Sequence, residues 1–139
     1  MRGAGAGTLV RMGTVSVRYI VDDVDAAAAF YRDRLGFEVK FQPGPGFAML
    51  SRGDLRLLLS AVSGPGGASQ PMPDGRRPEP GGWNRFQIEV ADLARTAEEL
   101  REARVTFRGA IVEGRGGRQL LIEDPAGNPV ELFEPAPRG

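Results

Sequence analysis

The chain has 139 residues with 18 basic and 18 acidic side chains, so its formal net charge is zero. This length suits one compact domain, which could be built from a duplicated unit, and the balanced charge gives no reason to expect nucleic acid or an anionic membrane as a partner. The chain contains neither cysteine nor histidine. Disulfides and thiolate chemistry are therefore excluded, and the commonest general base and transition-metal ligand is missing.

Residues 1–13 are small and glycine-rich, with two arginines and no apolar segment of the kind a secretory signal needs. We expect them to form a flexible N-terminal tail. No apolar run in the chain approaches the roughly 18 to 20 residues that a membrane span requires. The sequence therefore predicts a soluble, cytoplasmic protein.

Residues 14–62 have the pattern of one strand, one helix and three further strands. Alternation of β-branched residues over 15–21 predicts a strand that places Ser16 and Arg18 on one face. Asp23 suits the N-cap and Gly36 the C-terminal cap of a helix over 24–35. That helix is expected to pack its Phe30/Leu35 side on a sheet formed by strands at 37–41, 46–51 and 55–61, with residues 52–54 as a hairpin turn.

Residues 63–83 are expected to be a linker or a lid. Within them, positions 65–82 contain five prolines and five glycines, a composition that cannot supply a packed strand or helix. Loops of this length in a compact domain tend to be functional or mobile. The sequence leaves open whether this one is a plain spacer or closes over a ligand.

Residues 84–135 repeat the first pattern at an offset of 69. A strand at 85–90 and a helix at 93–103 are followed by predicted strands at 105–111, 118–123 and 129–133, and residues 124–128 have the composition of a turn. On the last strand Glu131 and Phe133 share one face. The fold class is therefore α+β, with two tandem βαβββ modules.

Four segments at the repeat spacing are similar to those of the vicinal oxygen chelate superfamily, which includes glyoxalases, bleomycin-resistance proteins and extradiol dioxygenases. They are V-x-D-V at 21–24, F-Y-x-x-x-L-G-F at 30–37, V-x-D-L at 90–93 and D-P-x-G-N-x-x-E-L at 124–132. The resemblance spans about residues 14–135. It implies that the modules form an incomplete, eight-stranded, barrel-like cleft, commonly in a homodimer.

The resemblance also implies four metal-ligand positions, which in this chain are Ser16, Leu58, Arg85 and Glu131. Leucine has no donor atom and a guanidinium repels a cation, so only Glu131 suits a divalent metal. We therefore expect no metal cofactor, although a carboxylate cage from Glu89 and Glu131 is the alternative. If Arg85 and Glu131 face one cleft, the arginine takes the place of the cation and pairs with the carboxylate. The pair could equally be a purely structural ion pair.

Other candidate ligand-binding residues follow from strand parity and from the position of aromatic side chains. Trp83 stands beside the linker, where an amphipathic ring can close over a ligand. The remaining candidates are Arg18, Gln87 and Phe133, which share faces with the four positions, and Phe41, Phe47 and Phe107 as aromatic walls.

Three functions are compatible with these residues. The favoured one is a metal-independent protein that binds and sequesters an aromatic or amphipathic antibiotic-like molecule, as in the bleomycin-resistance branch of the superfamily. The alternative is a lyase, isomerase or dioxygenase of the glyoxalase type that uses Glu131 or a metal. A general base needs a pKa near neutrality, whereas an adjacent arginine favours the ionised carboxylate. An interaction module without a ligand is the third function.

Overall fold

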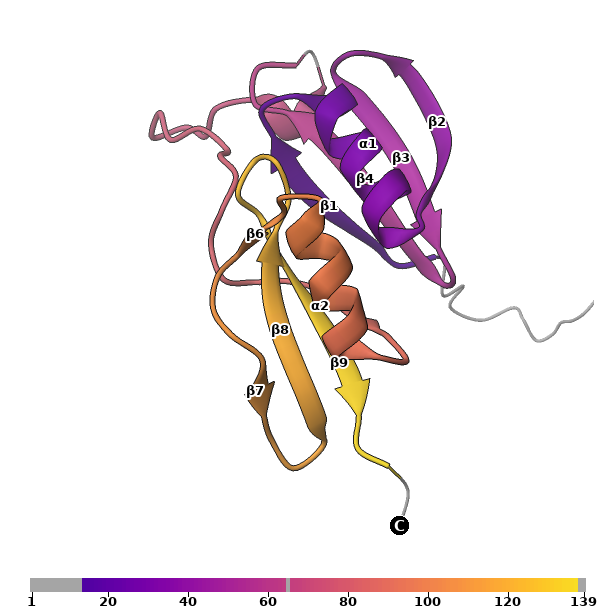
Figure 1. Cartoon of the computed structure of the whole chain (residues 1–139). Helices are drawn as coiled ribbons and strands as arrows, with labels where there is room; N and C mark the ends of the chain where they lie inside the picture. The colour runs from indigo at the N-terminus through magenta and orange to yellow at the C-terminus, as the bar shows by residue number, and fades with distance from the viewer. Residues whose placement is uncertain (1–13, 65, 138–139) are drawn as a thin grey trace, which may run out of the picture.

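Two β-sheets, each covered on one face by a helix, make up the computed structural model of the protein, which describes residues 14–64 and 66–137 (Figure 1). The predicted tail at 1–13 lies outside the described residues. The first module consists of β1 (Ser16–Val21), α1 (Val24–Leu35), β2 (Glu38–Gly44), β3 (Phe47–Arg52) and β4 (Leu55–Ala61). The second module consists of β5 (Gln87–Glu89), α2 (Leu93–Glu102), β6 (Thr106–Phe107), β7 (Val112–Glu113), β8 (Gly117–Glu123) and β9 (Pro129–Pro135).

Helix α1 begins and ends where its capping residues require. The Asp23 carboxylate accepts a hydrogen bond from the backbone N–H of Ala26 at 3.0 Å, and Gly36 has a left-handed φ of 73°. The predicted bounds of this helix are confirmed. Leu35 is buried as expected, but Tyr31 rather than Phe30 is the fully buried aromatic residue of this helix.

The two sheets repeat one topology. The first has the strand order β1-β4-β3-β2, and in the second the order β5-β9-β8 continues with β6 and β7, which both pair with β8. In each module the first strand lies parallel to the last one. The single strand predicted over 105–111 is wrong: β6 and β7 are separate short strands, and Gly109, which has no side chain to pack on a sheet, lies in the break.

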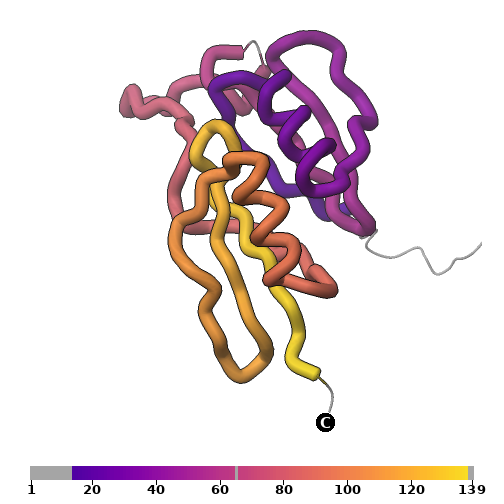
Figure 2. Tube along the Cα trace, viewed as in Figure 1, coloured from indigo at the N-terminus to yellow at the C-terminus, as the bar shows by residue number. Residues whose placement is uncertain are grey.

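Each helix covers one face of its own sheet and leaves the opposite face open. In Figure 1 both helices lie on the viewer's side of their sheets, so both open faces turn away from the viewer. Between β4 and β5 the described residues form an extended loop along one edge of the molecule, and this described part contains one short 3-10 turn, η1 (Gly67–Ser69) (Figure 2). Neither helix in the described part of the chain is long and apolar enough to cross a membrane.

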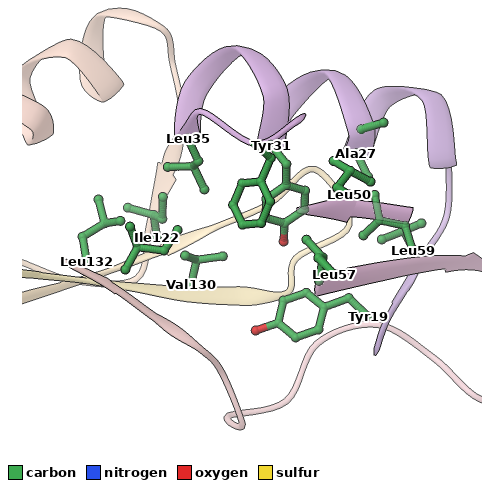
Figure 3. Packing of buried hydrophobic residues seen from close by; sticks show 14 of the residues in the cluster. Tyr19, Ala27, Tyr31, Leu35, Leu50, Leu57, Leu59, Ile122, Val130 and Leu132 are labelled. Atoms are coloured by element: carbon green, nitrogen blue, oxygen red, sulfur yellow. The ribbon is translucent and has the colours of Figure 1, made fainter. Parts of the chain in front are cut away.

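The hydrophobic core is continuous across the two modules. Its buried residues come from both sheets and both helices, and Figure 3 shows Leu35 at the end of α1 beside Ile122 and Leu132 of the second sheet. The ring of Phe86, from the second module, lies 5.2 Å from the ring of Tyr19 in the first. Burial of these side chains removes apolar surface from water, and the modules are therefore held together by the same force that stabilises each one.

A buried carboxylate anchors the turn between β8 and β9 to the first module. Asp124 is 4% exposed and accepts a hydrogen bond from the Tyr31 hydroxyl of α1 at 2.8 Å. Its other oxygen accepts from the backbone N–H groups of Ala126 and Asn128, both at 2.9 Å, which fixes the turn itself. Because one carboxylate satisfies donors from both modules, it couples the conformation of the turn to the position of α1.

Two further hydrogen bonds join the turn to β1. The Asn128 side chain donates to the carbonyl oxygen of Ile20 at 2.8 Å, and the Tyr19 hydroxyl donates to the carbonyl oxygen of Pro129 at 2.7 Å. Burial raises the pKa of Tyr19 to about 12 and that of Tyr31 well above its ordinary value, so both hydroxyls remain donors.

The pH dependence of stability reports on Asp124. Burial raises its pKa above the ordinary 3.8, an effect that its hydrogen-bond donors oppose. A raised folded-state pKa means that the contribution of this group to stability is fully present below the unfolded-state value and is lost as pH rises through the folded-state value. We therefore expect the free energy of unfolding of the wild type, minus that of Asp124→Asn, to fall as pH rises from below 3.8. Urea titrations at a series of acidic pH values measure this difference.

Glu134 is the matched control, because its pKa shifts in the opposite direction. Hydrogen bonds from the backbone N–H of Leu93 and from Arg118 lower the pKa of Glu134 below 4.5. The free energy of unfolding of the wild type, minus that of Glu134→Gln, should therefore fall as pH decreases. Slopes of the same sign for the two variants would contradict the assignment of Asp124 as the group with the raised pKa.

Candidate functional site

Glu131 lies at the centre of a polar cluster on the open face of the second sheet. Parallel pairing of β5 with β9 sets Gln87 directly opposite Glu131. Glu131 is 8% exposed, and its Oε1 accepts from both Nε and Nη2 of Arg85, at 3.1 and 2.9 Å. Its Oε2 accepts from the Gln87 side chain at 2.6 Å. The expected ion pair therefore forms, with glutamine as a third member.

This geometry limits what Glu131 can do chemically. Three of the roughly four acceptor positions of this carboxylate are engaged, two on Oε1 and one on Oε2, so a single position on Oε2 remains for a proton or a cation. The other positions implied for a metal are Ser16, Leu58 and Arg85, of which the last two offer no ligand atom for a cation. Within residues 14–64 and 66–137, no three acidic side chains lie close enough together to hold a metal ion. Glu89 and Glu131 therefore have no third carboxylate among these residues with which to form a cage. This donor set does not fit a divalent metal.

Trp83 lies on the same open face, against a second ion pair. The guanidinium of Arg108 stands 4.8 Å from the centre of the Trp83 ring, a cation–π distance. Arg108 also donates to Glu123 at 2.8 Å and to the carbonyl oxygens of Gly82 and Gly127. Trp83 as a whole residue remains 69% exposed, so it is accessible to a ligand.

Arg108 and Glu123 also belong to this face and were not among the predicted residues. The position of Glu123 could have been found from the hairpin formed by β8 and β9. In it Leu121 pairs with Glu131, and Glu123 lies two residues further along β8, so strand parity places Glu123 on the same open face as Glu131. No comparable signal marked Arg108, because it follows a short strand whose register was not predictable.

The open face of the first sheet carries the other group of predicted residues. Ser16 and Arg18 extend from β1, and Arg18 pairs with Leu58 of β4, which in turn pairs with Met49 of β3. Phe41 lies beside Met49 on β2 and is 55% exposed. The first open face is therefore more apolar than the second.

A cavity of about 680 Å³ opens at one end of the first open face. It is lined by Arg18, Phe47 and Ser60, by the turn at 43–46 and by the loop at 66–69, and by no residue of the second module. Arg18 donates from Nη1 to the Ser60 hydroxyl at 2.7 Å. Two of the predicted ligand-binding residues, Arg18 and Phe47, therefore line one cavity, whereas the prediction placed the ligand between the two modules.

The predicted residues do not form a single cluster. Arg85, Gln87, Glu131 and Phe133 share the second open face, where Phe133 pairs with Gln119 of β8. Phe107 lies on the opposite, helix-covered face, where the guanidinium of Arg101 in α2 stands 4.9 Å from its ring centre. The reason is register: Phe107 pairs with the buried Ile122, so its side chain joins the core face of the sheet.

Coupling between Arg85 and Glu131 can be measured by a double-mutant cycle with Arg85→Ala and Glu131→Gln. The side chains are 27% and 11% exposed, between the surface and the deep interior, so we expect a coupling free energy of about 1–2 kcal/mol from urea unfolding.

The exposed pair Arg95–Glu99 on α2, at 3.6 Å with side chains 77% and 66% exposed, is the control. Its cycle should give only about 0.3–0.5 kcal/mol. Equal coupling in the two cycles would show that Arg85 and Glu131 do not form the desolvated pair described above.

One protein-family model matches most of this chain. The sequence model of the Glyoxalase/Bleomycin resistance protein/Dioxygenase superfamily matches residues 13–132. No match was found among curated proteins.

Three solved structures are similar to the chain over most of its length. A bleomycin-binding protein from bleomycin-producing Streptomyces verticillus, in complex with copper(II)-bleomycin, is 26% identical with a TM-score of 0.60, over 92% of this chain and 100% of that one. A lactoylglutathione lyase from Agrobacterium tumefaciens is 25% identical with a TM-score of 0.66, over 89% and 94%. A superfamily member from Sphaerobacter thermophilus is 28% identical with a TM-score of 0.69, over 91% and 99%.

Proposed function

Given that this chain belongs to the glyoxalase/bleomycin resistance protein/dioxygenase superfamily, we propose that it is a metal-independent protein that binds an aromatic or amphipathic antibiotic-like molecule and sequesters it. The observation that carries this proposal is the state of Glu131. It is the one carboxylate among the four positions implied for a metal, and both of its oxygens accept hydrogen bonds, one from Arg85 and the other from Gln87. A site of this kind offers hydrogen bonds and shape and has no unengaged reactive group.

The open faces supply the remaining requirements for a binding site. The cavity of about 680 Å³ on the first face is large enough for a drug-sized molecule. Phe41, Phe47 and Trp83 offer aromatic surface on which a planar ligand can stack. The similarity to a bleomycin-binding protein at 26% identity agrees with this function, and sequestration in the cytoplasm would protect a cell from the bound drug.

An enzyme of the glyoxalase type is the second candidate, and the similarity to a lactoylglutathione lyase favours it. Proton transfer by Glu131 would rearrange the hydrogen bonds that its carboxylate accepts from Arg85 at 2.9 Å and from Gln87 at 2.6 Å. The binding function needs no such rearrangement. We therefore place catalysis second.

The proposed functional unit is a homodimer. The first open face exposes Phe41, and Leu58 and Met49 lie beside it only half-buried. A second copy of the chain that lay against this face would cover these side chains and would enclose the ligand between modules.

We expect light scattering to give a mass twice that of one chain, and Phe41→Asp to shift the protein toward the monomer because a charge would be buried at the contact. A monomeric wild type at all concentrations would contradict the dimer.

Calorimetric titration with bleomycin, doxorubicin and nalidixic acid tests the binding function. These antibiotics combine aromatic or amphipathic bodies with different charges. We expect saturable binding of at least one of them to protein dialysed against EDTA, with the same affinity after zinc or copper is restored. Quenching of Trp83 fluorescence should follow the heat signal, and Trp83→Phe identifies the origin of the quenching.

Recovery of the antibiotic unchanged from the complex separates sequestration from catalysis. Binding that needs added metal, or chemical conversion of the antibiotic, would contradict the proposed function. Failure of all three antibiotics to bind would also count against it.

A further inference from the structure

We propose that the cavity on the first open face selects small aromatic molecules that carry an anionic group, with Arg18 as the residue that binds the anion. This inference rests on the proposed function and adds to it, because it names the chemical class of the ligand. It concerns the charge of the ligand, which the proposed function leaves open.

The cavity walls favour an apolar, flat ligand body. Besides Arg18, its lining consists of Phe47, two serines and a series of proline, glycine and alanine residues from the turn at 43–46 and the loop at 66–69. Small residues keep the walls close to the backbone and leave the volume of about 680 Å³ open. A two- or three-ring molecule can bury its apolar surface there while it contacts the Phe47 ring.

Among the described residues that line this cavity, Arg18 is the one with a charged side chain. No ion pair within residues 14–64 and 66–137 includes it, whereas the arginines of the second open face, Arg85 and Arg108, are each paired with a carboxylate at 2.9 and 2.8 Å. The guanidinium has five N–H donors, and its hydrogen bond to Ser60 uses only one nitrogen, Nη1. The edge of the cavity therefore carries an uncompensated positive charge with donors to spare.

Ser60 completes the recognition of an anion. It is 4% exposed, and its hydroxyl oxygen accepts from Arg18 at 2.7 Å. Within the described residues this hydroxyl donates no hydrogen bond, so its own proton can point to a ligand oxygen. Arg18 and Ser60 together present donors to one place, which is the arrangement that a carboxylate, sulfonate or phosphate group requires.

The two open faces therefore differ in the charge that they offer. On the second face the positive charges of Arg85 and Arg108 are neutralised by Glu131 and Glu123. On the first face nothing described neutralises Arg18, so a cationic ligand is repelled and an anionic one is attracted. Charge selection is therefore a property of the first open face and of the Arg18 side chain on it.

A pair of fluorescent probes with one aromatic framework tests this inference. 8-Anilinonaphthalene-1-sulfonate carries a sulfonate, and N-phenyl-1-naphthylamine is the same ring system without it. Both become more fluorescent in an apolar cavity, so equilibrium titrations yield both dissociation constants. We expect the sulfonate to bind about tenfold more tightly than the neutral probe, because charge-assisted hydrogen bonds add to the shared burial of the rings.

Three variants locate the effect. Arg18→Gln should weaken binding of the sulfonate about tenfold and leave the neutral probe unchanged. Arg56→Gln is the matched control: Arg56 pairs with Ser16 on the same open face, outside the cavity lining, and its replacement removes the same charge from the same sheet. Phe47→Ala should weaken the binding of both probes by the same factor. Circular dichroism and thermal unfolding verify that each variant is folded.

The outcomes separate this inference from the proposed function. Equal binding of the two probes by the wild type, or an equal effect of Arg18→Gln and Arg56→Gln, would overturn the role of Arg18 and leave antibiotic binding intact. Absence of sulfonate binding to a folded wild type would overturn the cavity as an anion site. If the antibiotics fail in calorimetry while Arg18 still discriminates between the probes, the proposed function fails and the anion site stands.

Discussion

The carboxylate of Asp124 at the junction of the modules is the interaction on which the arrangement of both sheets depends. It accepts hydrogen bonds from the Tyr31 hydroxyl of α1 and from two backbone N–H groups of the turn between β8 and β9. Asn128 extends the same network to β1 and, through its side-chain oxygen, to the backbone of Gly81 at 2.8 Å. A buried carboxylate tolerates few geometries, so the turn, α1 and the end of the linker are held in one arrangement.

This arrangement determines where the two binding surfaces lie. Because the turn leads directly into β9, fixing it sets the register of Glu131 against Gln87 and hence the polar cluster on the second open face. Because α1 is tied to the same carboxylate, its sheet turns its open face to the same side of the molecule (Figure 1). One face then presents paired charges with an exposed tryptophan, and the other presents an apolar cavity with an unpaired arginine.

Prediction from sequence succeeded where local chemistry decides the structure. Helix α1 is confirmed to the residue, because Asp23 as N-cap and Gly36 in the left-handed conformation leave no other bounds. The hairpin turn over 52–54 and the repeat of the module are also confirmed, because turn residues and the alternation of apolar residues in strands are likewise local features of the sequence. The break between β6 and β7 and the orientation of Phe107 were not predictable, because short strands take their register from the strand they pair with.

The sequence by itself determined the α+β class, the duplicated module and the superfamily. Through the period of two in a strand it also placed Gln87 on the face of Arg85, and Phe133 on the face of Glu131. Only the tertiary structure decided how these residues bond to one another, because a hydrogen-bond partner depends on which strands are neighbours. It also decided that the predicted site divides between two sheets, and that Arg18 lies at a cavity with Ser60 and Phe47. A cavity is the space that remains between packed elements, and no local pattern in a chain encodes its shape.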